Sequence, residues 1–98
     1  MHARVARYRI DPDKCEEAVA SFRDAGDEIA QLAGFKDGYV LIDRDDGEVV
    51  SVTLWESAAA LETSDAQASS SRRRAIQAVG GEVEAVTRYD VAVELGAR

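Results

Sequence analysis

One short stretch, SVTLWES at residues 51–57, brings hydroxyl and aromatic side chains together. Ser51 and Thr53 occupy alternate positions before Trp55, the only tryptophan of the chain. Alternate residues of a strand share a face, so two small hydroxyl residues would leave room beside an indole whose N–H needs a partner. We expect Trp55 to be half core and half pocket wall. Trp55→Ala should then cost less than the roughly 3–5 kcal/mol of a wholly buried residue.

A cation for the same pocket is available at Arg72. Helical spacing puts Arg72 on the apolar face of a segment at about 66–79, while Arg73 and Arg74 lean outward. A guanidinium there would stabilise an aromatic anion. We therefore predict Trp55 and Arg72 as catalytic residues. The side chains predicted to bind the ligand are Tyr8, Phe22, Tyr39, Ser51, Thr53 and Leu61, with core packing as the alternative for each aromatic ring.

The sequence lacks the residues that metal-dependent, nucleophilic or cofactor-dependent catalysis would need. The chain has one His and one Cys, too few for a metal cluster or a nucleophile–histidine pair of the usual kinds. No glycine-rich phosphate loop or dinucleotide fingerprint is present, so we expect no cofactor. Cys15 lies at an apolar helix position, which favours a small buried hydrophobe over a reactive thiol.

Composition narrows the partners. The 98 residues carry a net charge of −7, which disfavours binding to nucleic acid. No apolar run reaches the roughly 20 residues of a membrane span, and no signal peptide is evident. We expect a single domain over residues 1–98 that acts in the cytoplasm, with neither membrane nor nucleic acid as a partner.

Turn and cap residues divide the chain into alternating elements. Asp11 and Pro12 suit the start of a helix and Gly34 its end, with a kink at Gly26. Gly47 suits a hairpin turn. We expect strands at 3–10, 39–43, 48–55 and 82–95, and helices at 11–33, 57–61 and 66–79, the last two separated by a break at ETSD.

The order β-α-β-β-α-β predicts an α+β, ferredoxin-like fold with a four-stranded antiparallel sheet. Both helices would pack on one face of the sheet. The third and fourth strands nevertheless carry apolar residues on both faces, which a bare sheet face would not need. We therefore expect a homodimer in which two sheets pack face to face.

GFKDGYVLID followed by a hairpin and by SVTLWES resembles the antibiotic biosynthesis monooxygenase family of dimeric α+β barrels. The resemblance covers nearly the whole chain, and it implies the same fold and a homodimer. It leaves the activity open, because the family includes quinone-forming oxygenases, haem degraders and members without a known reaction.

Haem-degrading relatives carry an Asn on the first strand, a Trp within the second helix and a His beyond it. Residue by residue, this chain has Ala6, Ser64 and Arg73 at those positions. The only histidine, His2, lies at the terminus. The resemblance therefore disfavours haem degradation.

Cofactor-independent, quinone-forming relatives use the Trp of Trp-Glu-Ser, an Asn shortly before it, and a Tyr and an Arg in the following helix. Trp55 matches, but Ser51 and Leu61 occupy the Asn and Tyr positions. The Arg position falls on Ala75, one residue from Arg74 and three from Arg72. Two functions stay open: a small cofactor-independent monooxygenase acting on an aromatic substrate, and a non-catalytic dimeric module that binds a small apolar ligand.

Overall fold

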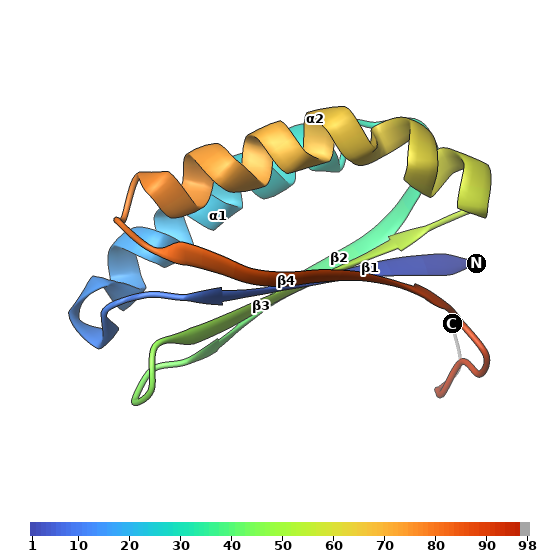
Figure 1. The fold of residues 1–98 in the computed structure, drawn as a ribbon. Helices are drawn as coiled ribbons and strands as arrows, with labels where there is room; N and C mark the ends of the chain where they lie inside the picture. Colours follow the sequence, from blue (N-terminus) through green and yellow to red (C-terminus); the bar gives the residue numbers. More distant parts are fainter. Residues whose placement is uncertain (97–98) are drawn as a thin grey trace.

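Two helices cover one face of a four-stranded sheet in the computed structural model, which describes residues 1–96 (Figure 1). The sheet has the order β2-β3-β1-β4, and all three strand pairs are antiparallel. This is the predicted α+β ferredoxin-like fold. The elements are β1 (His2–Arg9), a 3₁₀ turn (Pro12–Lys14), α1 (Cys15–Ile29), β2 (Phe35–Asp43), β3 (Glu48–Trp55), α2 (Ala58–Gln77) and β4 (Glu82–Asp90).

Strand alternation separates a covered face of the sheet from an open one. On the two central strands Ala6 lies opposite Ser51 and Tyr8 opposite Val49, and all four are buried beneath the helices. The alternate positions face away from the helices, where they form what we call the open face. Three large side chains there are about half exposed: Tyr39, Leu41 and Tyr89.

The predicted break in the second helix is wrong, because α2 runs without interruption from Ala58 to Gln77. Ser57 caps its start by accepting a hydrogen bond from the backbone N–H of Ala60 at 3.1 Å. The polar residues Ser64 and Asp65 look like helix breakers in the sequence. They stay helical because their side chains bind Arg4 on β1, a partner sixty residues away in the chain.

Three predicted boundaries also move. α1 ends at Ile29, and the backbone N–H of Leu32 closes a tighter turn onto the Ile29 carbonyl at 3.0 Å. β2 begins early, at Phe35, whose ring packs edge-on against Trp55. β4 ends at Asp90, opposite His2, and not at residue 95; beyond it the backbone N–H of Val91 donates to the Met1 carbonyl at 3.0 Å.

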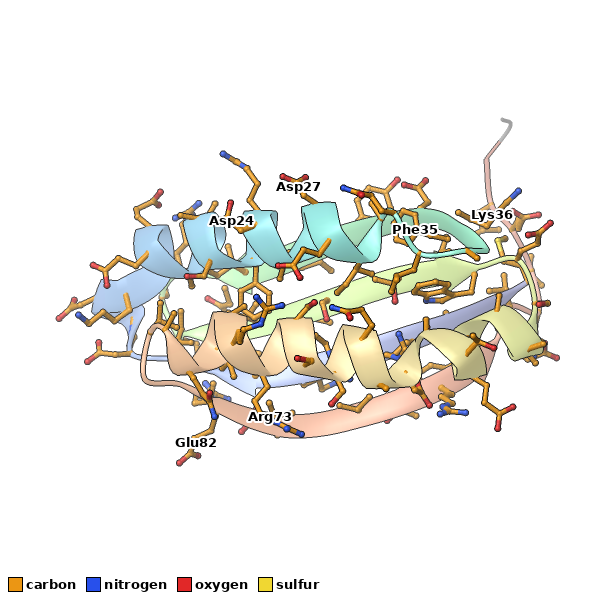
Figure 2. All side chains as sticks on the ribbon, turned by 90° about the horizontal axis from the view of Figure 1, so that it is seen from above. Asp24, Asp27, Phe35, Lys36, Arg73 and Glu82 are labelled. Atoms are coloured by element: carbon orange, nitrogen blue, oxygen red, sulfur yellow. The ribbon has the colours of Figure 1, made fainter. Side chains whose placement is uncertain are left out.

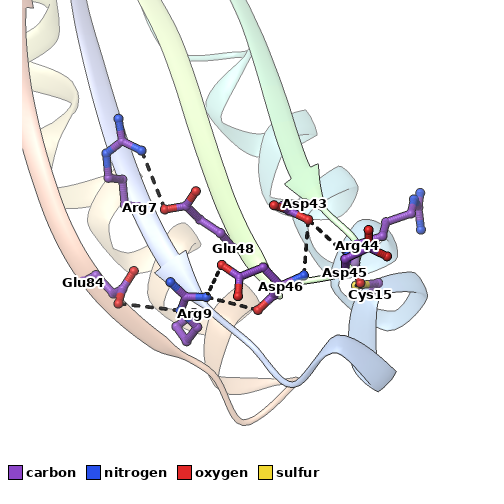
Figure 3. A network of polar contacts seen from close by, with 9 residues as sticks. All are labelled: Arg7, Arg9, Cys15, Asp43, Arg44, Asp45, Asp46, Glu48 and Glu84. Carbon is purple, nitrogen blue, oxygen red and sulfur yellow. Dashed lines mark hydrogen bonds and ion pairs between the residues drawn. The ribbon is translucent and has the colours of Figure 1, made fainter.

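A polar network fixes the β2–β3 turn against the end of β1 (Figure 3). Asp43 accepts hydrogen bonds from the backbone N–H groups of Asp45 and Asp46 at 3.1 and 3.2 Å. Arg9 donates to the Asp46 carboxylate at 2.9 Å. Gly47 has a φ of +78°, and an added Cβ would lie 2.2 Å from the Ile10 carbonyl oxygen. The turn is thereby held in one register with β1.

No helix within residues 1–96 is long and apolar enough to cross a membrane. The same residues include no group of three or more His, Cys, Asp or Glu side chains placed to hold a metal ion. Cys15 is buried, as predicted, with 6% of its surface exposed. The cytoplasmic location stays a prediction.

Candidate active site

A cavity of about 360 Å³ lies between α1 and the sheet. Its size falls within the range of roughly 300–1,000 Å³ that small-molecule sites occupy. Aromatic and aliphatic side chains make up much of the wall, and its polar groups come from the sheet, from α2 and, at Arg23 and Asp27, from α1. The lining residues include Arg4, Phe22, Phe35, Ser51, Thr53 and Arg72.

Local structure explains why the cavity stays open. Ser51 and Thr53 lie on the covered face of β3, where larger side chains would fill the space. Gly38 lies opposite Thr53 on β2. An added Cβ at Gly38 would lie 3.3 Å from both the Phe35 ring and the Val52 carbonyl oxygen. Small residues on two neighbouring strands therefore leave the hollow that α1 covers.

Both wall hydroxyls are held by aromatic side chains outside the wall. The Ser51 hydroxyl makes a 3.0 Å hydrogen bond with the Tyr8 hydroxyl. The Thr53 hydroxyl accepts a 2.9 Å hydrogen bond from the indole N–H of Trp55. Each oxygen therefore has a fixed position and retains capacity for further hydrogen bonds to a ligand.

Trp55 does not line the cavity, which corrects the expectation that it forms half of the wall. The side chain is fully buried and packs with Ile29, Leu61 and Ala68. Phe35, which does line the cavity, contacts it edge-on with ring centres 5.5 Å apart. Trp55 therefore supports the wall from behind.

Arg72 lines the cavity, as its place on the helix predicted. Arg73 points away from α1 on the outer side of α2 (Figure 2). Arg74 instead donates to Glu28 of α1 at 2.7 Å. Burial lowers the pKa of Arg72, and repulsion from Arg4 lowers it further, against an opposing contribution from Tyr8.

The other predicted ligand residues divide into two groups. Phe22 lines the cavity, and its ring packs against Tyr8 with centres 4.8 Å apart. Tyr8 and Leu61 are fully or almost fully buried and lie outside the wall. Tyr39 borders the cavity, although its register with Val52 directs its side chain to the open face.

Burial raises the pKa of Tyr8, and its hydrogen bond to Ser51 only partly offsets the rise. The phenol therefore remains neutral near neutral pH. A neutral Tyr8 can donate its hydroxyl hydrogen to Ser51, which leaves the Ser51 hydrogen available to the cavity. Nearby Arg72 and Arg4 lower the pKa of Tyr8 by smaller amounts.

Sequence reasoning missed Arg4, which has 2% of its surface exposed and lines the cavity from β1. One terminal nitrogen, Nη2, donates to the Leu61 carbonyl at 2.8 Å, to the Ser64 hydroxyl at 3.0 Å and to the Asp65 carboxylate. The signal was present in the alternation of β1, because Arg4 shares a face with Ala6 and Tyr8. A buried arginine at such a position needs an explanation.

A β2-β3-β1-β4 antiparallel sheet with two helices on one face defines a ferredoxin-like domain. The chain belongs to the antibiotic biosynthesis monooxygenase family, whose model matches residues 1–78. No curated protein matches it.

Solved structures share the fold at low sequence identity. A protein from Deinococcus radiodurans superimposes with a TM-score of 0.76 at 13% identity, covering 100% of this chain and 99% of the other. SnoaB from Streptomyces nogalater, a cofactor-independent oxygenase, gives 0.75 at 21%, covering 98% and 97%. Rv0793 from Mycobacterium tuberculosis gives 0.72 at 21%, covering 97% and 98%.

Proposed function

We propose that the protein is a cofactor-independent monooxygenase that oxidises a planar phenolic substrate with O₂. The observation that carries the proposal is the aromatic cavity with a guanidinium, Arg72, on its wall. The rings of Phe22 and Phe35 provide the apolar surface for a planar substrate. The fold shared with SnoaB supports the same reaction class.

The proposed reaction balances without a cofactor. An ionised phenol with a hydrogen at its para carbon passes electrons to O₂, and one oxygen atom then bonds to that carbon. The phenolic and para hydrogens leave with the second oxygen atom as water, and the product is a quinone. Arg72 would stabilise the negative charge on the phenolate oxygen, while Ser51 and Thr53 position the ring.

The test uses 1-naphthol, whose oxidation to 1,4-naphthoquinone consumes one O₂. We expect oxygen uptake above the autoxidation rate, quinone absorbance in equal amount, and one atom of isotopically labelled O₂ in the quinone. Heat-denatured protein is the control. Binding of 1-naphthol without oxygen uptake would contradict the proposal.

A specific contact favours the second function, a non-catalytic module that binds a small apolar ligand. Ser51 occupies the position of the Asn in quinone-forming relatives, and its hydroxyl is already hydrogen bonded to Tyr8. The chain contains no Asn. The naphthol experiment separates the two functions, because the module would bind the ring and leave it unchanged.

A further inference from the structure

Two donors of a buried guanidinium have no partner. The Nε and Nη1 atoms of Arg4 are buried and make no hydrogen bond with any residue that the structure describes. All three acceptors that Arg4 contacts are shared by its remaining nitrogen, Nη2. Buried polar groups are nearly always hydrogen bonded, so an unpartnered donor of this kind needs an acceptor from outside the protein.

The charges around Arg4 do not balance either. Asp65 is the carboxylate that pairs with Arg4, and its other oxygen pairs with Arg88 of β4. One negative charge therefore serves two guanidinium groups. Arg72 adds a further positive charge on the same cavity wall, and no ion pair within residues 1–96 involves it. The wall also includes Arg23, Asp27 and Asp37, so its three arginines outnumber its two carboxylates.

Water would compensate this positive charge poorly, because the guanidinium is desolvated. Burial lowers the pKa of Arg4, and repulsion from Arg88 lowers it further. One face of the group lies over Trp55, 5.5 Å from the ring centre. An anion at the cavity end of Arg4 would satisfy both the free donors and the unbalanced charge.

We propose that Arg4 is a substrate-binding residue, and that the cavity takes an aromatic compound bearing an ionised oxygen, either a phenolate or a carboxylate. The ring lies against Phe22 and Phe35, and the anionic oxygen accepts from Nε or Nη1 of Arg4. This inference rests on the proposed function in taking the cavity as the substrate site.

Calorimetric titration with two probes of nearly equal shape tests the charge preference. The anion is 2-naphthoate and its neutral counterpart is 2-naphthalenemethanol. We expect the unaltered protein to bind the anion about tenfold or more tightly, the effect of a charge-assisted hydrogen bond. Equal affinities of the unaltered protein for the two probes, or no binding of 2-naphthoate, would overturn the proposal.

A matched pair of variants assigns the preference to Arg4. Arg4→Met removes the guanidinium that lines the cavity. Arg88→Met removes the other partner of Asp65, and Arg88 does not line the cavity. We expect Arg4→Met to abolish the preference for 2-naphthoate while affinity for the neutral probe stays within about twofold. Arg88→Met should keep the preference. If a folded Arg4→Met protein bound neither probe, the Arg4 side chain would only shape the cavity.

A third probe shows whether the cavity prefers a phenolate or a carboxylate. Binding of 4-nitrophenol as the phenolate would lower its apparent pKa, which is read from the yellow colour of the anion. A lowered pKa that Arg4→Met restores indicates a phenolate site, whereas preference for 2-naphthoate alone indicates a carboxylate site. Oxygen uptake is measured separately, so anion binding without oxidation contradicts the proposed function and leaves this inference standing.

Discussion

The guanidinium of Arg4 lies 5.5 Å from the centre of the Trp55 ring, and both side chains are buried. A desolvated pair of this kind contributes about 2 kcal/mol. The contact explains why the tryptophan is set back from the cavity: it covers one face of a cation that reaches the wall. Trp55 also fixes Thr53 through its indole N–H, so one buried ring orders two wall residues.

Trp55→Ala should destabilise the protein by about 3–5 kcal/mol, the usual effect of emptying a wholly buried aromatic site. This replaces the smaller effect expected from the sequence, because the ring is 0% exposed. Urea unfolding measures the change, with Tyr89→Ala, at a half-exposed ring, as the control. A loss below about 1 kcal/mol would contradict the buried position.

Arg72→Met should lower kcat for oxygen uptake with 1-naphthol by about 100-fold, the usual loss when one group that stabilises a developing anion is removed. Arg73→Met removes the same charge from the neighbouring residue, which points away from α1 (Figure 2), and should leave kcat unchanged. Equal losses in the two variants would indicate a general charge effect rather than a contact in the cavity.

Stability should fall in alkaline solution because of Tyr8. Its raised pKa means that the folded protein keeps this proton at a pH where the unfolded chain, with a tyrosine pKa of about 10, has lost it. The unfolded state then binds fewer protons, so the free energy of unfolding decreases as pH rises above about 10. Urea unfolding between about pH 8 and 11 should show a smaller decrease for Tyr8→Phe than for Tyr89→Phe.

Asp65→Ala should destabilise the protein by about 1–3 kcal/mol, because the buried Arg4 loses its charged partner. The double variant Arg4→Met, Asp65→Ala should recover most of that stability, since the buried Arg4 guanidinium is then absent and Arg88, the other partner of Asp65, is half exposed to water. Thermal unfolding of the unaltered protein, the two single variants and the double variant measures the coupling between Arg4 and Asp65. Additive effects would show that the two side chains do not depend on each other.

We propose that the open face forms a homodimer. Leu41 is 54% exposed on this face and lies beside the partly buried Val50 and Val52. Leu41→Lys should therefore produce monomers in sedimentation. Val86→Lys is the control, because Val86 has similar exposure but lies opposite Ala6 on the covered face. A stable monomer of the unaltered protein at micromolar concentration would contradict the proposal.

Much of the fold could be predicted from local patterns in the sequence. The bounds of β3, the grouping of Ser51 and Thr53 on one face, and the inward position of Arg72 follow from strand and helix periodicity. Arg4 and the continuity of α2 could not be predicted this way. Arg4 and the Ser64 turn of α2 stabilise each other although they lie sixty residues apart in the sequence. Local propensity alone disfavours a buried arginine in a strand and polar residues such as serine within a helix.

The central position of β1 has a consequence for biosynthesis. β1 pairs with β3 on one edge and with β4 on the other, yet it is translated before both. Until residues 82–90 leave the ribosome, the nascent chain carries β1 with an unpaired edge that can recruit another chain. Only the β2–β3 hairpin pairs strands that are consecutive in the sequence. Because the other strand pairs join distant parts of the chain, we expect slow folding for a protein of this length. A chaperone that shields the β1 edge during translation should raise the yield of folded protein.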